Sequence, residues 1–375
     1  MIIGVPREIK NNEYRVALTP SGVQVLVREG HRVIVETTAG AGSGFEDSEY
    51  AAMGAEIAAK AAQVYQGADL ILKVKEPLPP EYELIREHQV IFTFLHLARE
   101  KELTNVFLEK KITAIAYETI QLSDGRLPLL IPMSEVAGKM AIQIGAHFLE
   151  QSQGGRGVLL GGVPGVPPAE VVIIGAGTAG ANAARVAIGM GAVVTLIDIN
   201  IDRLRYFDEV YTGRVQTMVS NPYNISLSVA KADLLVGAVL LPGAKAPVLV
   251  SEEMVKKMKP GSVIIDVAID QGGCVATIDR VSTHSNPIDN KHGVIHYSVG
   301  NIPGAVPFTA TNALTNATLP YVLEIAKFGP RIAAMKNPAL AKGFNVCKGQ
   351  ITHEGVALAL SLPYQPLEGV LKLKI

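Results

Sequence analysis

The chain has 375 residues, a formal net charge of −1 at pH 7, and 48% hydrophobic residues with 36 glycines. This length predicts two domains, each with ample core, and the near-zero charge excludes the strongly basic surface that binds nucleic acids or membrane surfaces. No run of about 18 uninterrupted apolar residues is present, so we expect a soluble α/β enzyme without a membrane span.

The cysteines and the first residues indicate the compartment. Cys274 and Cys347 are far apart and form no Cys-x-x-Cys pair, which favours a reducing, cytoplasmic location and argues against a structural zinc site. Residues 1–6 have the pattern of a short strand rather than of a signal peptide.

The first 130 residues alternate between strand and helix patterns, which predicts a parallel sheet. One helix has Thr19 as its N-cap, Pro20 at its first position and Gly30 past its end, and another covers about Lys101–Lys110. The expected strands are Ile2–Val5, Arg32–Glu36, Leu70–Val74, Val90–Phe94 and Thr113–Ala116.

Polar residues follow three of these strands, and ligands bind at the carboxyl ends of strands in open parallel sheets. Arg15 lies in the loop after the first strand, Lys75 follows the third and His96 follows the fourth. Two cations and an imidazole at one edge suit a small anionic substrate that gains and loses protons.

Each of these three residues also has a structural interpretation. Arg15 is also compatible with a solvated loop charge, the usual role among the 34 Lys and Arg residues, and Lys75 with a partner of Glu76 or Glu118. His96 is also compatible with a hydrogen-bonded core histidine. Taken singly, each residue is more often structural, and their shared edge favours function.

Residues 131–152 have helical periodicity, and a helix of about 20 residues spans roughly 30 Å, enough to cross between two domains. The Gly- and Pro-rich stretch 154–168 is interpreted as a surface connector.

The stretch 171–198 contains a complete dinucleotide-binding fingerprint. An apolar strand leads into Gly175, Gly177 and Gly180, then a helix and a second strand that ends at Asp198. A carboxylate there accepts ribose hydroxyls and repels a 2′-phosphate, so we predict NAD rather than NADP. Arg203 is the nearby group able to receive that phosphate, and a tight turn that binds nothing is the structural alternative.

The second sheet is expected to have about six strands, as a doubly wound dinucleotide fold requires. They cover about 171–174, 193–197, 215–219, 234–237, 262–267 and 294–297. Asp270 follows the fifth strand, beside the expected nicotinamide, although aspartate is also a common turn residue before Gly272-Gly273.

A turn and helix over 302–327 predict a second linker that returns the chain to the first domain. The expected organisation is a discontinuous substrate domain, 1–130 plus 306–375, and a nucleotide domain, 131–305.

Several motifs resemble one family, the NAD-dependent L-alanine dehydrogenases and the related NAD-binding subunits of transhydrogenases. The motifs are GVPRE at 4–8, RVALTP at 15–20, KVKEP at 73–77, LHL at 95–97, GGVPGV at 161–166, DVAIDQGGC at 266–274 and AVPFTAT at 305–311. The resemblance covers nearly the whole chain. It implies two Rossmann-like domains joined by long helices, with the active site in a cleft between them.

The resemblance also implies an activity: reversible oxidative deamination of L-alanine to pyruvate and ammonium with NAD⁺. Arg15 and Lys75 would bind the substrate carboxylate and carbonyl, His96 would be the general acid/base, and Asp270 would assist proton transfer. The implied nucleotide contacts are Ser134, Gly175, Gly177, Thr178, Ala179, Gly180, Asp198, Arg203, Ser220, Val239, Leu240, Val267, Ala268, Ile269, Asp270, Ser298, Val299, Gly300 and Asn301.

Two other functions compatible with the fingerprint are a transhydrogenase-like subunit without substrate chemistry and an NADH-sensing regulator. The transhydrogenase subunits lack the His and Asp at positions matching His96 and Asp270, and this sequence has both. Some family members hold a divalent ion between a residue like Glu118 and a histidine. Lys327 stands near that histidine's place here, so we expect no metal. The resemblance favours a homohexamer.

Overall fold

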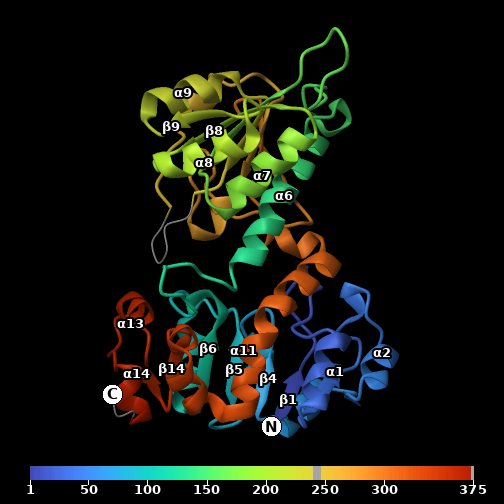
Figure 1. Cartoon of the computed structure of the whole chain (residues 1–375), viewed down its shortest axis with the longest axis vertical. Coiled ribbons are helices and arrows are strands. Elements are labelled where there is room, and N and C mark those ends of the chain that lie inside the picture. The colour runs from blue at the N-terminus through green and yellow to red at the C-terminus, as the bar shows by residue number, and fades with distance from the viewer. Residues whose placement is uncertain (240–245, 373–375) are drawn as a thin grey trace. The chain divides into compact units, whose positions relative to one another are not determined.

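The computed structural model describes residues 1–239 and 246–372, and only the backbone of Asp270 and Gln271. It divides the chain into two compact units, which are described separately (Figure 1). Unit 1 contains residues 1–133 and 306–375, and unit 2 contains residues 134–305. Among the described residues, no helix is long and apolar enough to cross a membrane.

Unit 1 is built on an eight-stranded sheet in the order β15-β14-β6-β5-β4-β1-β2-β3. The six strands from the N-terminal part are parallel, whereas β14 and β15 are antiparallel to their neighbours. The strands are β1 (Ile2–Val5), β2 (Arg32–Glu36), β3 (Glu56–Ala58), β4 (Leu70–Leu72), β5 (Val90–Thr93), β6 (Thr113–Ala116), β14 (Phe344–Cys347) and β15 (Gln350–Ile351).

Both faces of this sheet are buried. Ile91 and Phe92 are neighbours on β5 and point to opposite faces, and they belong to different apolar clusters. Helices and short helical turns supply the covering side chains: α1 (Pro20–Arg28), η1 (Ala41–Ser43), α2 (Asp47–Ala52), α3 (Ala61–Gly67), α4 (Pro79–Tyr82), α5 (Lys101–Glu109), η2 (Tyr117–Thr119), α11 (Pro307–Lys336), α12 (Pro338–Ala341), α13 (Glu354–Leu360) and α14 (Leu367–Leu371).

The predicted start of α1 is confirmed. Thr19 is extended and its side chain accepts a hydrogen bond from the Gly22 N–H, Pro20 is the first helical residue, and Gly30 has a φ of +84°. The predicted late helix, which ends near residue 327, is confirmed, and a second helical stretch that was not predicted follows it. Helix α11 continues to Lys336 through a break at Gly329, whose φ is +72° and which precedes Pro330.

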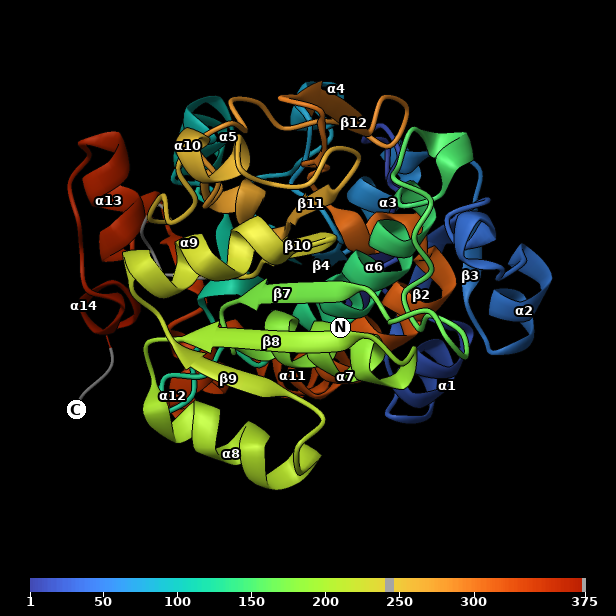
Figure 2. The ribbon, with the colours of Figure 1, turned by 90° about the horizontal axis from the view of Figure 1, so that it is seen from above.

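Unit 2 contains a seven-stranded sheet in the order β12-β13-β11-β10-β7-β8-β9. Figure 2 shows β7, β8 and β9 side by side and parallel. The strands are β7 (Glu170–Ile174), β8 (Val193–Asp198), β9 (Gln216–Val219), β10 (Leu234–Gly237), β11 (Val263–Asp266), β12 (Ile288–Lys291) and β13 (Val294–Tyr297). Six of them correspond to the predicted strands, and the antiparallel edge strand β12 was not predicted.

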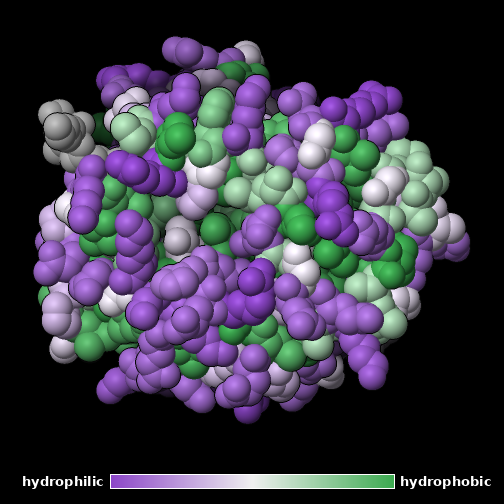
Figure 3. Space-filling view, turned by 90° about the horizontal axis from the view of Figure 1, so that it is seen from below, coloured by the Kyte–Doolittle hydropathy of each residue, from purple (hydrophilic) through white to green (hydrophobic). Residues whose placement is uncertain are grey.

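The helical segments of unit 2 are α6 (Ile131–Phe148, starting just before the boundary), η3 (Gln151–Gln153), α7 (Thr178–Gly189), α8 (Ile201–Tyr211), α9 (Pro222–Lys231), α10 (Glu252–Val255), η4 (Val267–Gln271) and η5 (Ile302–Ala305). Helix α6 therefore ends earlier than the predicted residue 152. The predicted fold class, two mainly parallel sheets with interleaved helices, is confirmed. On the face seen in Figure 3, hydrophilic and hydrophobic residues are interspersed.

Candidate functional site

Three loops leave the carboxyl edge of the unit 1 sheet and carry the predicted substrate residues. Strand β4 lies between β1 and β5, and all three are parallel. The loops after β1, β4 and β5 therefore leave neighbouring positions on the same edge, with Arg15, Lys75 and His96 respectively. This is the edge at which open parallel sheets bind ligands.

Arg15 is a buried ion-pair residue, so its interpretation as a solvated loop charge is wrong. It is 2% exposed, and its guanidinium makes two hydrogen bonds to Glu13, from Nε to Oε1 at 2.7 Å and from Nη2 to Oε2 at 2.6 Å. Nη1 lies 3.0 Å from the Met133 sulfur. Burial alone would raise the pKa of Glu13, but the Arg15 guanidinium, with help from the Lys75 charge, lowers that pKa to about 2.

Lys75 is half-buried in the segment that follows β4. Its carbonyl accepts a hydrogen bond from the Thr93 hydroxyl at 2.9 Å, and its N–H lies 3.3 Å from Glu8 Oε1. Of the two acidic residues considered as its partners, Glu76 pairs with Lys10 and Glu118 accepts the backbone N–H of His96. Since Arg15 and Lys75 both act on the Glu13 charge, the fold brings these two cations to one place.

His96 is a surface residue, so its interpretation as a core histidine is wrong. Its side chain is 44% exposed and stacks on Phe94, with ring centroids 6.1 Å apart and planes 5° apart. The backbone of His96 has a φ of +50°, a conformation that costs a non-glycine residue energy. Glu118 compensates by accepting the N–H of His96 at 2.6 Å and that of Leu95 at 3.2 Å, and its Oε1 is 3.9 Å from His96 Nδ1.

Sequence reasoning missed the supporting roles of Glu13 and Glu118. Glu13 stands two residues before Arg15, but nothing distinguishes it in sequence from the other acidic residues. Glu118 was considered only as an ion-pair partner or a metal ligand. Its capping of residues 95 and 96 depends on the pairing of β5 with β6, so the sequence carries no local signal for it.

In the part of the chain that the structure describes, no group of three or more His, Cys, Asp or Glu residues is arranged to hold a metal ion. Lys327, on α11, places its ammonium 5.7 Å from the ring centroid of Phe328.

The fingerprint of unit 2 has the geometry that phosphate binding requires. Gly175 has a φ of +104°, and a Cβ on Gly180 would lie 1.7 Å from the Gly175 carbonyl oxygen, so both positions need glycine to build the turn. A Cβ on Gly177, by contrast, would meet no described atom within 4 Å. No described part of the protein therefore excludes a side chain at Gly177. Open space in front of this backbone is what the approach of a pyrophosphate would need.

Gly177 is also the N-cap of α7, whose first turn contains Thr178 and Ala179. The unpaired N–H groups and the dipole of a helix start attract phosphate groups. The fingerprint residues therefore fit a dinucleotide.

Asp198 and Arg203 both contact the backbone of Ala176 inside the fingerprint turn. Asp198, the last residue of β8, accepts the Ala176 N–H at 2.5 Å and the Asn200 N–H at 2.7 Å. Arg203 donates to the Ala176 carbonyl from Nε at 3.2 Å and from Nη2 at 2.9 Å. Its guanidinium also lies over the rings of Tyr206 and Phe207.

Most other predicted nucleotide contacts lie at or near the carboxyl ends of the unit 2 strands. The Ser220 N–H donates to the Asp198 carbonyl after β9, Val239 follows β10, and η4 follows β11. Ser134 lies in the first turns of α6. Leu240 lies outside the described residues. Val267, Ala268, Ile269 and Asp270 are all in η4.

Strand β11 ends at Asp266, a residue to which the sequence analysis gave no role. Its buried carboxylate accepts the N–H of Ala268 at 2.9 Å and of Cys274 at 2.8 Å, which closes the turn containing η4. Burial raises the pKa of Asp266, against the opposing effect of these hydrogen bonds.

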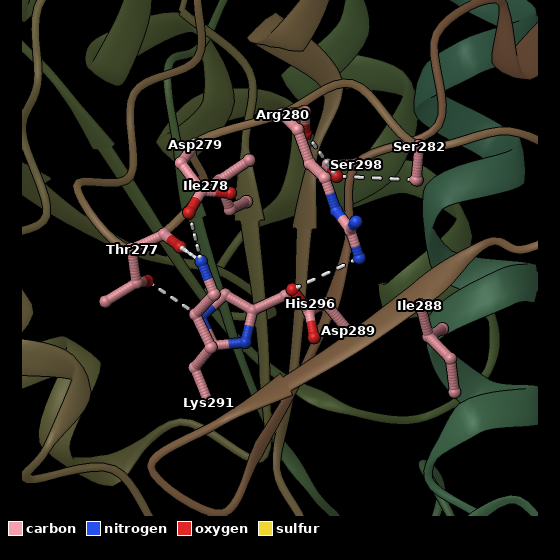
Figure 4. Close-up of a pocket in the computed structure, with 10 residues that line it drawn as sticks. All are labelled: Thr277, Ile278, Asp279, Arg280, Ser282, Ile288, Asp289, Lys291, His296 and Ser298. Carbon is pink, nitrogen blue, oxygen red and sulfur yellow. Dashed lines mark hydrogen bonds and ion pairs between the residues drawn. The ribbon is translucent and has the colours of Figure 1, made fainter.

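The predicted contacts at 298–301 follow β13. The Ser298 hydroxyl donates to the Arg280 carbonyl at 3.1 Å and contacts Ser282, at a small pocket that also contains His296 (Figure 4). Val299 is buried, and Gly300 is half-buried. Asn301 has a φ of +64°, and its carbonyl lies 3.2 Å from His284 Nε2.

Two family models match the chain. The N-terminal domain model of alanine dehydrogenase/PNT matches residues 4–137, and the C-terminal domain model matches residues 141–354. The alanine dehydrogenase of Methanococcus maripaludis is 61% identical over 371 residues, covering 99% of this chain and 100% of that protein. The alanine dehydrogenase of Bacillus subtilis is 59% identical over 373 residues, covering 99% and 98%.

Solved structures agree with these matches. A structure described as L-alanine dehydrogenase has 51% sequence identity and a TM-score of 0.94, covering 96% of this chain and 99% of that one. A transhydrogenase from Sinorhizobium meliloti has 25% identity and a TM-score of 0.80, covering 94% and 99%. The chain therefore belongs to the alanine dehydrogenase/PNT family.

Proposed function

We propose that this protein catalyses the reversible oxidative deamination of L-alanine, in which L-alanine, water and NAD⁺ give pyruvate, ammonium, NADH and a proton. The observation that carries the proposal is the full-length similarity to proteins named alanine dehydrogenase, at about 60% identity. The arrangement of Arg15, Lys75 and His96 at one sheet edge supports the same reaction.

The residues of unit 1 suit the substrate. Arg15, held by Glu13, offers a guanidinium to the alanine carboxylate, a pairing that is strong and directional. The Lys75 ammonium stabilises negative charge that develops on the substrate oxygen as water adds to the imine carbon. His96 is exposed, and its imidazole can exchange protons with the substrate and with that water.

NAD⁺, when bound, would supply the acceptor for the hydride of the alanine Cα. Gly175, Gly177, Gly180 and the start of α7 bind the pyrophosphate, and Asp198 accepts the ribose hydroxyls. The Asp198 carboxylate disfavours a 2′-phosphate, which supports NAD over NADP. We place Asp270 as an assistant in proton transfer, and the remaining predicted residues of unit 2 as nucleotide contacts.

This assignment makes the reaction depend on both units. Arg15, Lys75 and His96 belong to unit 1, whereas the fingerprint and Asp270 belong to unit 2. Hydride transfer requires close approach of the alanine Cα and the nicotinamide.

Substitution of Lys75 tests the proposal. Lys75→Ala should lower alanine-dependent NADH formation by at least about 10²–10³-fold while leaving the melting temperature unchanged. Lys101→Ala, which removes an exposed lysine at the start of α5, is the matched control and should retain wild-type rates. A fully active Lys75→Ala variant would contradict the assigned role.

The similarity to a transhydrogenase supports a second candidate, an NAD(H)-binding subunit without substrate chemistry. Under this candidate function, the exposed His96, whose backbone is in the left-handed region, has no role. It predicts NADH binding without any alanine-dependent reaction, as would an NADH-sensing regulator.

We further propose a cytoplasmic location and assembly as a homohexamer. Both cysteines are free thiols and buried, which suits a reducing compartment. Light scattering of the purified protein tests the hexamer directly.

A further inference from the structure

The segment that carries Lys75 rests on a buried cluster of charged side chains. The Lys73 ammonium lies 3.0 Å from Glu8 Oε2 and 3.0 Å from Glu81 Oε1. The Lys73 side chain is fully buried, and both glutamate side chains are 4% exposed. The Tyr65 hydroxyl donates to Glu81 Oε1 at 2.9 Å and completes the cluster.

Beyond the end of β4, the Glu8 carboxylate supplies the hydrogen-bond acceptor that a neighbouring strand would otherwise supply. Strand β1 pairs with β4 through Ile3 and Gly4 and ends at Val5, so it offers no backbone acceptors to the residues beyond β4. The Glu8 carboxylate lies there instead. Its Oε1 accepts the Val74 N–H at 2.6 Å and lies 3.3 Å from the Lys75 nitrogen. A buried N–H needs an acceptor, and here that acceptor comes from the loop that also carries Arg15.

The other end of the segment is held by the same cluster. Glu81 Oε2 accepts the Leu78 N–H at 2.9 Å, and the Lys73 ammonium joins Glu81 to Glu8. From the β5 side, the Thr93 hydroxyl donates to the Lys75 carbonyl. The backbone of Lys75 is thus fixed on one side by the Glu8 carboxylate and on the other by the Thr93 hydroxyl of β5.

Stability alone does not explain such a cluster, because buried ion pairs lose much of their Coulomb gain to desolvation. Two carboxylates and one ammonium also leave a formal excess of one negative charge. Well-packed apolar residues would stabilise the segment at least as much as this cluster does. Apolar side chains cannot, however, accept hydrogen bonds from two consecutive N–H groups, and it is these hydrogen bonds that fix the direction of the chain at Lys75.

We propose that Glu8 is a positioning residue for the reaction: its carboxylate, oriented by Lys73, fixes the Val74–Lys75 backbone and thereby directs the Lys75 ammonium at the substrate. This inference rests on the proposed function, in which Lys75 contacts the substrate. A displacement of about 1 Å in such a group is enough to lower a rate about 10²-fold.

Three variants test the role of Glu8. Glu8→Ala removes the acceptors, and Glu8→Gln keeps an amide oxygen for the two N–H groups. Glu56→Gln is the matched control, since Glu56 pairs with Arg32 at the surface of the same sheet, with both side chains more than half exposed. For each variant, kcat and KM for L-alanine, the Kd for NADH and the melting temperature are measured.

Glu8→Ala should lower kcat/KM for L-alanine about 10²-fold, mainly through kcat, with the NADH Kd unchanged. Glu8→Gln should recover about tenfold of that loss and stay about tenfold below the wild type. Its amide oxygen still accepts the N–H groups, but the neutral amide loses the ion pair with Lys73 that orients it. Glu56→Gln should match the wild type. A purely structural role would lower the melting temperature without changing kcat of the folded enzyme.

The inference is overturned if folded Glu8→Ala and Glu8→Gln both keep wild-type kcat/KM. If Glu8→Ala does not fold, Glu8→Gln decides: a lower kcat with unchanged NADH affinity supports the role, and a wild-type kcat refutes it. Failure of the proposed function is distinguishable, because the wild type and Glu56→Gln would then also form no NADH from L-alanine.

Discussion

The Glu13 carboxylate and the Arg15 guanidinium are joined by two parallel hydrogen bonds, with Oε1 2.7 Å from Nε and Oε2 2.6 Å from Nη2. Both side chains are almost completely buried. Glu13 therefore fixes the plane of the guanidinium and balances its charge. Without this carboxylate, Arg15 would be a buried cation without that partner, a costly arrangement.

Glu13→Gln should therefore change how stability depends on pH. The pKa of Glu13 is lowered from 4.5 to about 2 in the folded protein, so its ion pair stabilises the fold above about pH 4.5 and loses this effect as the pH falls toward 2. The shift corresponds to a contribution on the order of 3 kcal/mol at neutral pH. Denaturant unfolding at several pH values measures the difference between wild type and variant.

That difference should be large at pH 7 and shrink as the pH falls below 4.5. Glu56→Gln, which removes a carboxylate from an exposed pair, should show a small difference throughout. A wild type and Glu13→Gln whose stabilities stay parallel across this range would refute the role of Glu13.

Replacing His96 should separate chemistry from nucleotide binding. His96→Ala should lower alanine deamination about 10²–10⁴-fold, the usual contribution of a general acid/base, with the NADH Kd unchanged. His88→Ala is the matched control, because His88 is also exposed with a positive φ but precedes β5 rather than following it. Near-normal turnover by His96→Ala would remove the acid/base role.

Two glycines of the fingerprint should respond differently to alanine. Gly177→Ala should change the free energy of unfolding by no more than about 1 kcal/mol, because its Cβ meets no described atom within 4 Å. Its NADH Kd should rise at least about tenfold, since the methyl group obstructs the pyrophosphate.

Gly180→Ala is the complementary variant. Its Cβ would lie 1.7 Å from the Gly175 carbonyl oxygen, so the variant should lose about 1–3 kcal/mol of stability or more. Thermal unfolding and NADH fluorescence titration measure both quantities. A Gly177→Ala variant with wild-type NADH affinity would contradict the placement of the pyrophosphate.

Asp198 should set the preference between NAD and NADP. Asp198→Ala removes the charge that repels a 2′-phosphate, while Arg203 remains nearby. The ratio of kcat/KM for NADP⁺ to that for NAD⁺ should rise at least about tenfold, equivalent to about 1.4 kcal/mol. Asp202→Ala, at an exposed ion pair on α8, should leave the ratio unchanged. The same ratio in both variants would count against Asp198.

The strands that were predicted from sequence are those bounded by clear turn signals. Val171–Ile174 and Leu234–Gly237 are continuous apolar runs, as expected for central parallel strands. The four missed strands lack this pattern: β3 has three residues and β15 only two, β12 is Ile-Asp-Asn-Lys at the sheet edge, and Asn345 interrupts the apolar residues of β14. Edge strands are exposed on one side, so they need not be apolar.

The site was predictable to a similar extent. Arg15, Lys75 and His96 could be found because each follows a recognisable strand, and parallel strands bring such residues to one edge. The residues that hold these three in place could not be found from the sequence. Lys73 contacts Glu8 across 65 positions in the chain, and this contact depends on the pairing of β1 with β4, which no local pattern specifies.

The central claim is that the protein oxidises L-alanine with NAD⁺, and the near-ultraviolet absorbance of NADH tests it most directly. The purified protein is mixed at alkaline pH with each combination of L-alanine or another small amino acid and NAD⁺ or NADP⁺. Our account predicts NADH formation with L-alanine and NAD⁺, with pyruvate and ammonium in equal amounts, and far slower reaction with NADP⁺. An absence of NADH from a protein that still binds the nucleotide would contradict it.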